Sequence, residues 1–368
     1  MNEPAFFLSH RLPIALAAQR QGYVVHVASK SGEDVNKIID KGLIHHEIPL
    51  SRSGSNPLVE LISLFKIWWL LICLKPEVVH LVTIKPVLYG GIAARLSQVK
   101  KVVAAVSGLG TLFLAQGFSA KVKYYIGALL YKLALRTNKT TVILQNPDDK
   151  KLLINLGAMK ERQAVLIRGS GVDLSEYPFV PENTTKQPSI TFAARLLFDK
   201  GLIEYIEAIK LLNSRGVDAT YQLVGDLDAG NLTSASATDL AEWQKIPNLN
   251  VLGYKKDIAG IFASTNLVVL PSYREGLPKV LIEAAACGRA VVTTDVPGCR
   301  DAITPDVTGF LVPVQDSVAL ADTIQKLIEN PKQRVAMGKA GRELAESTFT
   351  IENVISQHMS IYNEVLSE

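Results

Sequence analysis

The sequence contains few of the residues and segments that mark a secreted or a zinc-binding protein. Only 3 of its 368 residues are cysteines (Cys73, Cys287 and Cys299), an odd number without Cys-x-x-Cys spacing. This pattern indicates neither a disulfide framework nor a zinc site, and it favours a reducing cytosol. No basic segment followed by an apolar core stands at the N-terminus, so the sequence gives no sign of a signal peptide.

Long uninterrupted apolar runs are also lacking. The most apolar stretch, residues 58–74, is interrupted by Lys66 and is too short for a confident membrane span. Trp68 and Trp69 beside this lysine are typical of a helix that lies in a membrane interface, although a buried crossover helix of an α/β domain explains the same residues. A second stretch, residues 121–136, mixes cations, tyrosines and leucines in the same way.

The charges are divided unevenly along the chain. Residues 1–165 carry 21 Lys and Arg against 10 Asp and Glu, whereas residues 166–368 carry 18 against 25. A basic half joined to an acidic half indicates that one half meets an anionic partner. The aromatic and basic motifs of RNA- and DNA-binding modules are absent, so we expect an anionic membrane surface and no nucleic acid.

Strand-like and helix-like segments alternate along the whole chain. The 48% hydrophobic and 20% charged composition suits an α/β protein with a substantial core, and the length suggests two domains. The alternation predicts doubly wound parallel sheets with helices on both faces. The predicted strands are 23–28, 43–49, 78–82, 101–106, 140–144 and 164–167, then 189–194, 220–224, 251–253, 267–270, 290–294 and 309–312.

A glycine-rich crossing at residues 168–173, followed by a polar segment with three prolines, marks the domain boundary. We expect an N-terminal domain over 1–170 and a C-terminal domain over 171–348. A final helix over 349–368 is expected to pack back on the N-terminal domain. Two Rossmann-like domains are expected to face each other across a cleft, with the ligand site at the carboxyl ends of both sheets.

The start of the chain departs from this pattern. A doubly wound domain ordinarily opens with a strand, but residues 1–7 indicate a loop. We therefore expect the N-terminal domain to lack its first strand.

The stretch from Pro271 to Gly288 is the centre of the predicted site. A buried strand over 267–270 leads into a turn with Gly276 and Pro278, and a helix follows from Val280. A helix N-terminus beside a glycine-bearing loop is an anion site. Two acids in this stretch, Glu275 and Glu283, would repel a phosphate, so hydroxyls of a sugar or ribose suit them better. A capped helix with two solvated acids is the alternative.

Two further loops follow predicted strands of the same half and carry polar residues. Arg195 and Lys200, five positions apart, suit a diphosphate, because arginine spans two oxygens and lysine supplies a point charge. Gly225 and Asp226 follow the next strand, and they could also form an ordinary turn. A solvated loop remains the alternative for the two cations.

These motifs together resemble the retaining family 4 glycosyltransferases of the GT-B fold, over nearly the full length of the chain. The resemblance lies in Glu275-x7-Glu283 within residues 272–288, and in three further motifs at 195–201, 224–226 and 171–173. Residues 7–13, 80–86 and 294–299 look like a narrower branch. Its members extend undecaprenyl-diphosphate-linked sugars for bacterial O-antigen, capsule or protein glycans.

The resemblance implies that the domain over 1–170 binds the acceptor and the domain over 171–348 binds the nucleotide-sugar. It also implies roles for single positions. Arg195 and Lys200 would bind the donor diphosphate and stabilise charge on the leaving group without a metal or other cofactor. Glu283 would hold the ribose hydroxyls and Glu275 the donor sugar. Backbone groups of Gly276, Leu277 and the neighbours of Pro278 would meet the sugar and phosphate, since Pro278 has no N–H; Gly225 and Asp226 would complete the donor site.

In the N-terminal half, the resemblance implies that His10 contacts the acceptor diphosphate or the donor. Many family members also carry a histidine after the strand that matches residues 102–106. This chain has Ser107 and Gly108 there instead, so backbone groups would have to supply that contact.

The resemblance therefore implies a hexosyltransferase that would move a hexose or N-acetylhexosamine from a UDP-sugar to a polyprenyl-diphosphate-linked saccharide. It would act in the cytoplasm, at the inner face of the bacterial cytoplasmic membrane. Two alternatives remain: a nucleotide-sugar epimerase of similar fold, and a relative that binds nucleotide or glycan with impaired catalysis.

Overall fold

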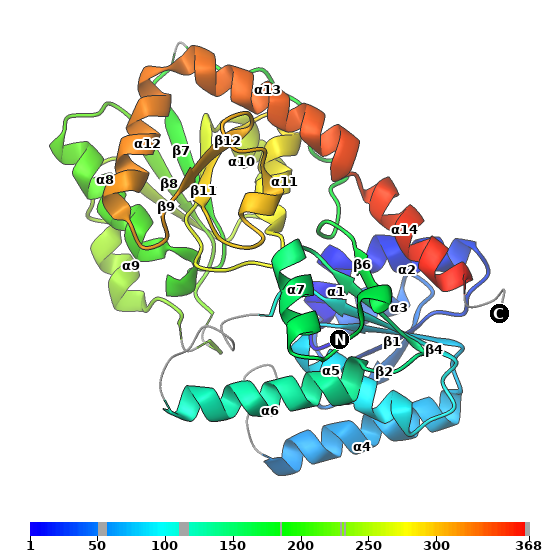
Figure 1. The fold of residues 1–368 in the computed structure, drawn as a ribbon. Coiled ribbons are helices and arrows are strands. Elements are labelled where there is room, and N and C mark those ends of the chain that lie inside the picture. The colour runs from blue at the N-terminus through cyan, green and yellow to red at the C-terminus, as the bar shows by residue number, and fades with distance from the viewer. Residues whose placement is uncertain (51–56, 110–117, 185, 229, 232, 365–368) are drawn as a thin grey trace. The chain divides into compact units, whose positions relative to one another are not determined.

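The structure is a computed structural model that describes residues 1–50, 57–109, 118–184, 186–228, 230–231 and 233–364. The chain divides into two compact units (Figure 1): Met1–Ser170 together with Ile351–Glu368, and Gly171–Thr350. Both are α/β units built on parallel sheets, which confirms the predicted class. No helix within the described ranges is both long enough and apolar enough to cross a bilayer.

The first unit contains two separate parallel sheets, where we expected one doubly wound sheet. Four strands pair in the order β3-β4-β5-β6, and β1 pairs only with β2 among the described strands. The strands are β1 (His26–Ser29), β2 (Ile44–Glu47), β3 (Val78–Val82), β4 (Lys101–Val106), β5 (Thr140–Leu144) and β6 (Ala164–Leu166). The expectation of one sheet was wrong because β1 and β3 do not pair with each other.

The helices of the first unit begin earlier than expected. Residues 1–7 were expected to form a loop, but α1 begins at Pro4, whose fixed φ and missing N–H suit a first helical position. The chain kinks at Arg11 and continues in α2. The helices are α1 (Pro4–His10), α2 (Leu12–Arg20), α3 (Val35–Ile39), α4 (Pro57–Leu74), α5 (Ile84–Arg95), α6 (Phe118–Leu135), α7 (Pro147–Asn155) and α14 (Ile351–Asn363).

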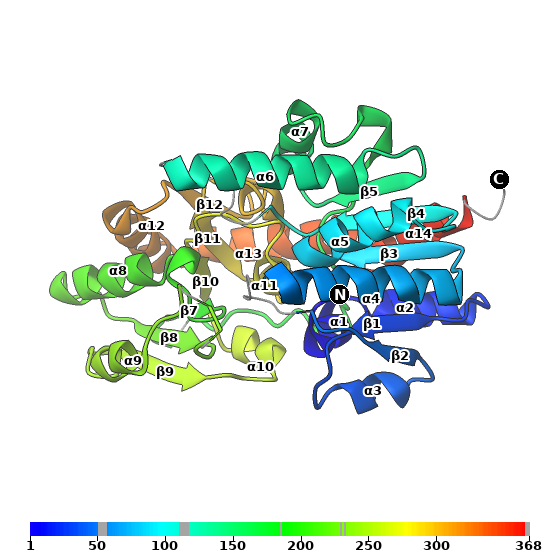
Figure 2. The same cartoon turned by 90° about the horizontal axis from the view of Figure 1, so that it is seen from below.

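Helix α5 lies at the centre of one layer of this unit, and both α4 and α6 pack on it (Figure 2). Two consecutive glycines of α5 allow close approaches to two different elements. A Cβ on Gly90 would lie 2.3 Å from the Leu81 side chain of β3, and one on Gly91 would lie 2.7 Å from the Ala134 carbonyl oxygen of α6. The terminal helix α14 packs on α2, where Tyr362 joins the core cluster of Ile14.

The second unit has one six-stranded parallel sheet in the order β12-β11-β10-β7-β8-β9. Its strands are β7 (Ser189–Ala193), β8 (Thr220–Val224), β9 (Leu249–Gly253), β10 (Leu267–Leu270), β11 (Ala290–Thr294) and β12 (Gly309–Val312). Every residue of β7, β10 and β11 is buried, as expected for central strands with helices on both faces. The order reverses next to β7, and such a switch point is where open α/β sheets bind ligands.

The helices of this unit are α8 (Leu202–Ser214), α9 (Ala237–Trp243), α10 (Ile258–Ala263), α11 (Lys279–Ala286), α12 (Ser317–Glu329) and α13 (Pro331–Thr348). Helix α9 was not predicted. Its signal in the sequence is a capping box, in which the Ser236 hydroxyl accepts from the Asp239 N–H and the Asp239 carboxylate accepts from the Ser236 N–H.

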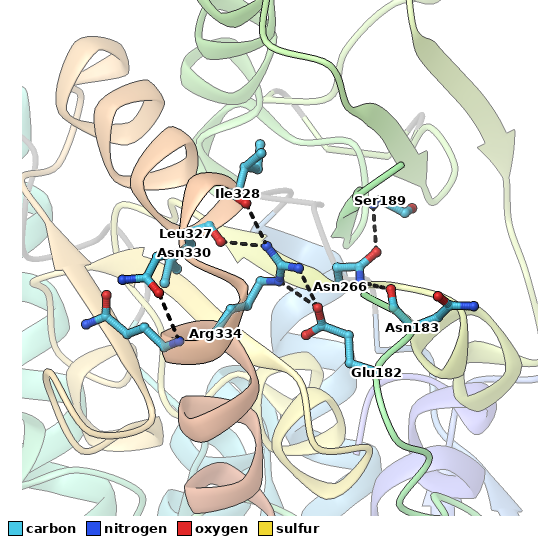
Figure 3. A network of polar contacts seen from close by, with 9 residues as sticks. Glu182, Asn183, Ser189, Asn266, Leu327, Ile328, Asn330 and Arg334 are labelled. Carbon is cyan, nitrogen blue, oxygen red and sulfur yellow. Dashed lines mark hydrogen bonds and ion pairs between the residues drawn. The ribbon is translucent and has the colours of Figure 1, made fainter. Parts of the chain in front are cut away.

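The polar segment that enters the second unit is fixed to its helices by buried polar contacts (Figure 3). The guanidinium of Arg334 on α13 donates to Glu182 Oε1 and to the carbonyl of Leu327, at the end of α12. Asn266 accepts from the Ser189 N–H at 2.9 Å and donates to the Asn183 carbonyl at 3.1 Å. The segment is therefore an anchored part of this unit.

Candidate active site

The predicted donor residues lie on loops that follow neighbouring strands of the second sheet. Arg195 follows β7, Gly225 and Asp226 follow β8, and Glu275 follows β10. Since the carboxyl ends of parallel strands share one edge of a sheet, these loops lie together there.

Glycines bring the loops into backbone contact. A Cβ on Gly201 would lie 2.0 Å from the Pro271 carbonyl oxygen, and a Cβ on Gly225 would lie 1.8 Å from the Ala194 carbonyl oxygen. Both glycines also have positive φ angles, of +74° and +142°. No other residue type fits these two positions without moving the backbone.

Lys200 and Glu275 form the central contact of the site. Lys200 Nζ lies 2.5 Å from Glu275 Oε1, and their side chains are 16% and 14% exposed. The Ser272 hydroxyl donates to the same carboxylate oxygen at 2.9 Å. Burial alone would lower the pKa of Lys200, but the carboxylates of Glu275 and Asp199 outweigh it and raise the pKa above its usual value. The ammonium is therefore charged at neutral pH.

Arg195 lies at the exposed side of this edge. Its guanidinium donates to Asp228 Oδ2 at 2.6 Å, and about half of its side chain (47%) remains exposed. Asp226 accepts a hydrogen bond from the Tyr254 N–H at 3.1 Å and so joins the β8 and β9 ends. Gly225 and Asp226 thus have a structural role as a turn, whatever else they contact.

Glu283 is buried on the second turn of α11. It accepts from the Tyr177 hydroxyl at 2.7 Å, and Lys279 Nζ lies 3.1 Å from the same oxygen. Burial, followed by the charge of Glu283, raises the pKa of Tyr177 above its usual range, so the phenol stays protonated and donates. A carboxylate held by one phenol and one ammonium keeps lone pairs for further hydroxyl donors.

The turn before α11 is buried. Gly276, Leu277 and Pro278 are each less than 9% exposed, and the Leu277 side chain belongs to the core of the unit. No side chain caps the start of α11 among the described residues. Leu277 can therefore act at the site only through its backbone.

The predicted residues of the first unit gather around Arg11. Ser107, after β4, accepts a 3.4 Å hydrogen bond from Arg11 Nη2, and Gly108 follows with a φ of +114°. The ring of His10 stacks on Phe6 with centroids 4.1 Å apart. The geometry alone therefore gives His10 a packing role at the end of α1.

Three residues that were not predicted complete these contacts: Arg11, Tyr177 and Asp228. Arg11 is 5% exposed, and burial lowers its pKa to about 10. Asp228 pairs with Arg195, and Tyr177 holds Glu283. All three contacts join residues far apart in the sequence, and no local spacing signals such pairs.

Two family models match the chain. Residues 4–146 match the model "Glycosyl transferase 4-like", and residues 175–344 match "Glycosyl transferases group 1". The chain belongs to the group 1 glycosyltransferases, and its N-terminal part is of the glycosyltransferase 4-like type. The branch predicted from the sequence is also borne out, because full-length relatives act on undecaprenol-linked sugars.

Three curated relatives match the glycosyltransferase over most of its length. The N,N'-diacetylbacillosaminyl-diphospho-undecaprenol alpha-1,3-N-acetylgalactosaminyltransferase of Campylobacter jejuni is 29% identical over 98% of both chains. The capsular polysaccharide biosynthesis glycosyltransferase CapM of Staphylococcus aureus is 28% identical over 94% of this chain and 90% of its own. A UDP-Gal:alpha-D-GlcNAc-diphosphoundecaprenol alpha-1,3-galactosyltransferase of Escherichia coli is 22% identical over 93% and 89%.

Solved structures agree on the fold of the glycosyltransferase. HepE of Anabaena, in complex with UDP and glucose, matches with a TM-score of 0.75 and 19% identity over 95% of both chains. Sucrose-phosphate synthase of Thermosynechococcus elongatus matches with a TM-score of 0.78 and 20% identity over 96% of this chain and 92% of its own. These likenesses confirm the predicted fold of two Rossmann-like parallel α/β domains.

Proposed function

We propose that this glycosyltransferase moves a hexose or N-acetylhexosamine from a UDP-sugar to a polyprenyl-diphosphate-linked saccharide, with retention of configuration at the anomeric carbon. The Campylobacter and Escherichia relatives are named for diphosphoundecaprenol-linked acceptors, and the Anabaena structures for complexes with UDP, glucose and UDP-glucose. With such an acceptor, the enzyme would take part in the assembly of a bacterial surface glycan.

The observation that carries the proposal is the Lys200–Glu275 ion pair at the carboxyl edge of the sheet. A donor diphosphate offers Lys200 a replacement for its carboxylate partner, with charge-assisted hydrogen bonds of the same kind. Glu275 would then be released to accept hydrogen bonds from hydroxyls of the donor sugar. Arg195 would exchange Asp228 for phosphate oxygens in the same way, and its exposure leaves it free to do so.

Glu283 would bind the ribose hydroxyls of the donor. Tyr177 and Lys279 already hold its carboxylate in place. The side chain of Glu283 would therefore lose little conformational entropy when the ribose binds. Backbone groups of Gly276 and of the residues beside Pro278 would face the sugar and the diphosphate.

The reaction would be a front-face displacement. The bond from the anomeric carbon to the diphosphate oxygen breaks while the acceptor hydroxyl oxygen bonds to the same face of that carbon. The acceptor proton passes to the departing phosphate oxygen, so the products are UDP and the lengthened saccharide. Arg195 and Lys200 would stabilise the negative charge on UDP, and we expect activity without a metal ion.

The first unit would meet the inner face of the cytoplasmic membrane. Helices α4 and α6 flank α5 (Figure 2). Many of their large apolar side chains are exposed to solvent. These side chains are Leu58, Val59, Leu61, Ile62, Phe65 and Trp69 on α4, and Val122, Tyr125, Ile126, Leu129 and Leu133 on α6. Exposed apolar surface of this kind marks an interaction site. The excess of cations in residues 1–165 would add attraction to anionic lipids.

Replacement of Lys200 tests the proposal. In an assay of UDP release from UDP-N-acetylhexosamine and a membrane extract that contains polyprenyl-diphosphate saccharides, Lys200→Ala should lower kcat by about 100-fold to 1,000-fold, the loss typical of one such stabilising group. Lys210→Ala is the matched control, because Lys210 is an exposed lysine of α8 paired with Glu207. An undiminished rate for Lys200→Ala would overturn the assignment. Conversion of the UDP-sugar to its epimer without any acceptor would indicate an epimerase.

A further inference from the structure

A concavity in the first unit lies at the edge of the four-stranded sheet where its strands begin. Helices α5 and α6 pack side by side and both end there, because each leads into the next parallel strand. The space has a volume of about 380 Å³. Ser107 follows β4 and therefore lies at the opposite edge of the sheet. The concavity is thus separate from the contact that the resemblance implies at Ser107.

Four cations and no acid line this concavity, which we call the cationic pocket. They are Arg95 at the end of α5, Lys132 and Arg136 at the end of α6, and Lys160 in the turn before β6. All four residues are exposed, and none forms an ion pair within the described ranges. The carboxylate of Glu161, next to Lys160 in the chain, pairs instead with Lys150 at 2.5 Å. A concave surface with charge of one sign attracts and concentrates ions of the other sign.

A buried glutamine of the pocket lining fixes the turn that follows α6. Gln163 is 7% exposed. Its Nε2 donates to the carbonyls of Leu135, Thr137 and Thr140 at 2.9, 2.8 and 3.0 Å. This wall of the pocket is therefore ordered before any ligand binds, which lowers the entropic cost of binding.

A structural role accounts for only part of this charge. Arg95 Nη2 donates to the Arg136 carbonyl at 2.6 Å and so caps the end of α6, where a cation is favourable. The same helix dipole favours Lys132 and Arg136, but Lys160 is brought to the pocket by another segment. The side chains of Lys132, Arg136 and Lys160 make no hydrogen bond to the parts of the chain that the structure describes. These three cations are available to an anion.

The cationic pocket continues an exposed apolar row along α6. The row consists of Val122, Tyr125, Ile126, Leu129 and Leu133, all of them exposed. Its last two members also line the pocket. Lys132 and Arg136 follow Leu129 and Leu133 by three positions, so they begin on the same side of the helix. A ligand of the pocket therefore meets cations and, directly beside them, apolar side chains.

We infer that the cationic pocket binds the phosphate of an anionic phospholipid, while the apolar row enters the acyl region of the same bilayer. The inference rests on the membrane contact proposed above for α4 and α6. Lys132, Arg136 and Lys160 would donate charge-assisted hydrogen bonds to the phosphate oxygens. Their long stems let the charged ends stay at the headgroups while the leucines lie deeper. A nucleic acid also offers phosphates, but it offers no acyl chains to the apolar row.

The length of α6 gives the pocket a part in orienting the unit. The helix has 18 residues and so spans about 27 Å, with the cationic pocket at its C-terminal end. The apolar row alone does not set the depth at which each end of the helix lies. A phosphate bound in the pocket would hold the C-terminal end at headgroup depth and so limit the tilt of α6 against the bilayer.

Sedimentation of the full chain with vesicles tests the inference. The vesicles contain phosphatidylcholine with about 30% phosphatidylglycerol. Lys132→Ser with Lys160→Ser should weaken binding about 30-fold, or roughly fivefold per cation removed. Lys332→Ser with Lys339→Ser removes the same charge from exposed positions of α13 in the second unit, and it should weaken binding about twofold or less. Equal weakening in both double variants would overturn the inference.

A comparison with vesicles of phosphatidylcholine alone separates the pocket from the apolar surface. Phe65→Ser with Trp69→Ser should still prefer the vesicles that contain phosphatidylglycerol, whereas Lys132→Ser with Lys160→Ser should lose most of this preference. A preference that persists in the lysine variant would overturn the pocket and leave the membrane contact standing. If the unaltered chain sediments with neither kind of vesicle, the membrane contact and the pocket both fail.

A soluble lipid tests the pocket without a bilayer. Dihexanoyl-phosphatidylglycerol, kept below its micelle concentration, should shift the NMR amide signals of Thr137 and Asn138. Glycerol phosphate, which has no acyl chains, should bind at least 10-fold more weakly, as should dihexanoyl-phosphatidylcholine, which has no net charge. Equal affinity for glycerol phosphate would assign the pocket to a soluble phosphate compound. Tighter binding of polyuridylate than of the lipid would assign it to RNA, and either result would overturn the inference.

Discussion

At the scale of single residues, two glycines with nearly the same φ have different surroundings. Gly201 (φ +74°) and Gly216 (φ +73°) bracket α8, but a Cβ at Gly201 would strike the Pro271 carbonyl, whereas a Cβ at Gly216 meets nothing within 4 Å. Substitution of each glycine by alanine therefore separates two effects on the free energy of unfolding. One is the strain of a left-handed backbone, and the other is the steric clash between two loops.

We expect Gly216→Ala to lower the free energy of unfolding by about 1 kcal/mol, because alanine only has to adopt a left-handed conformation. Gly201→Ala should cost about 3 kcal/mol or more, since the Pro271 loop must also move. Urea unfolding of the two variants measures the difference. Equal losses would contradict the close approach of the Lys200 and Glu275 loops.

Two neutral histidines make the first unit sensitive to acid. Burial and the nearby Arg11 lower the pKa of His358 to about 4, and burial together with His358 lowers that of His80 well below its usual value. The ring of Tyr362 lies beside both histidines, and its hydroxyl forms a 2.6 Å hydrogen bond with His80 Nδ1. Below about pH 6.5 the unfolded chain protonates these rings while the folded unit keeps them neutral, so stability falls as the pH falls from about 6.5 to about 4.

The expected loss from His358 alone between pH 7 and pH 5 is about 2 kcal/mol. His358→Gln should flatten this part of the profile. Urea unfolding followed by the fluorescence of Trp68 and Trp69, in a Trp243→Phe background, reports on the first unit. If the free energy of unfolding of His358→Gln still falls as steeply between pH 7 and pH 5, His358 is not the source of the acid sensitivity.

At the scale of elements, the sequence predicts most of the helices and strands because their patterns are local. The strand over 267–270 and the helix after Pro278 are found as predicted, since a buried apolar run, a proline turn and a run of helix formers follow one another. Helix α1 was missed because residues 1–7 were interpreted as a loop, although Pro4 suits the first position of a helix. The separation of β1 from β3 could not be predicted, because strand pairing is not local.

The candidate site was predicted to a similar extent. The loops that carry Arg195, Lys200 and Glu275 follow from the alternation of strands and helices, since parallel strands end at one edge. The partners Asp228 and Tyr177 could not be predicted from this alternation, because they lie 33 and 106 positions from Arg195 and Glu283, the residues they bind. Their positions depend on how loops return to the sheet.

The buried pair of Arg334 and Glu182 holds α13 to the entry segment of the second unit, with side chains 2% and 4% exposed. Removing one member leaves an unpaired buried charge, which typically costs about 3–5 kcal/mol. We expect Arg334→Leu to lose about this much in urea unfolding. The double variant Arg334→Leu with Glu182→Leu should lose less than Arg334→Leu alone. Equal losses in the two variants would contradict this account and would show that the bonds of Arg334 to backbone carbonyls dominate.

At the scale of the whole molecule, the apolar side chains of α4 and α6 predict membrane binding. Phe65→Ser with Trp69→Ser should weaken sedimentation with phosphatidylglycerol vesicles about 10-fold or more, because two half-exposed aromatic rings are lost (58% and 55% exposed). Val318→Ser with Val335→Ser is the control, since these are exposed valines of the second unit. Binding should also weaken between 0.1 and 0.5 M salt. Equal binding of both double variants would contradict the prediction.

The placement of α14 in the first unit has a consequence for synthesis. His358 and Tyr362 fill the core beside Ile14 and His80, yet they are made after all of Gly171–Thr350. The bond from the Val172 N–H to the Phe349 carbonyl brings the two ends of the second unit together at 2.8 Å, so this unit forms a closed insertion. Domains generally complete folding in the order in which they leave the ribosome. Here the order is reversed: the unit that begins first is finished last, when the final helix emerges.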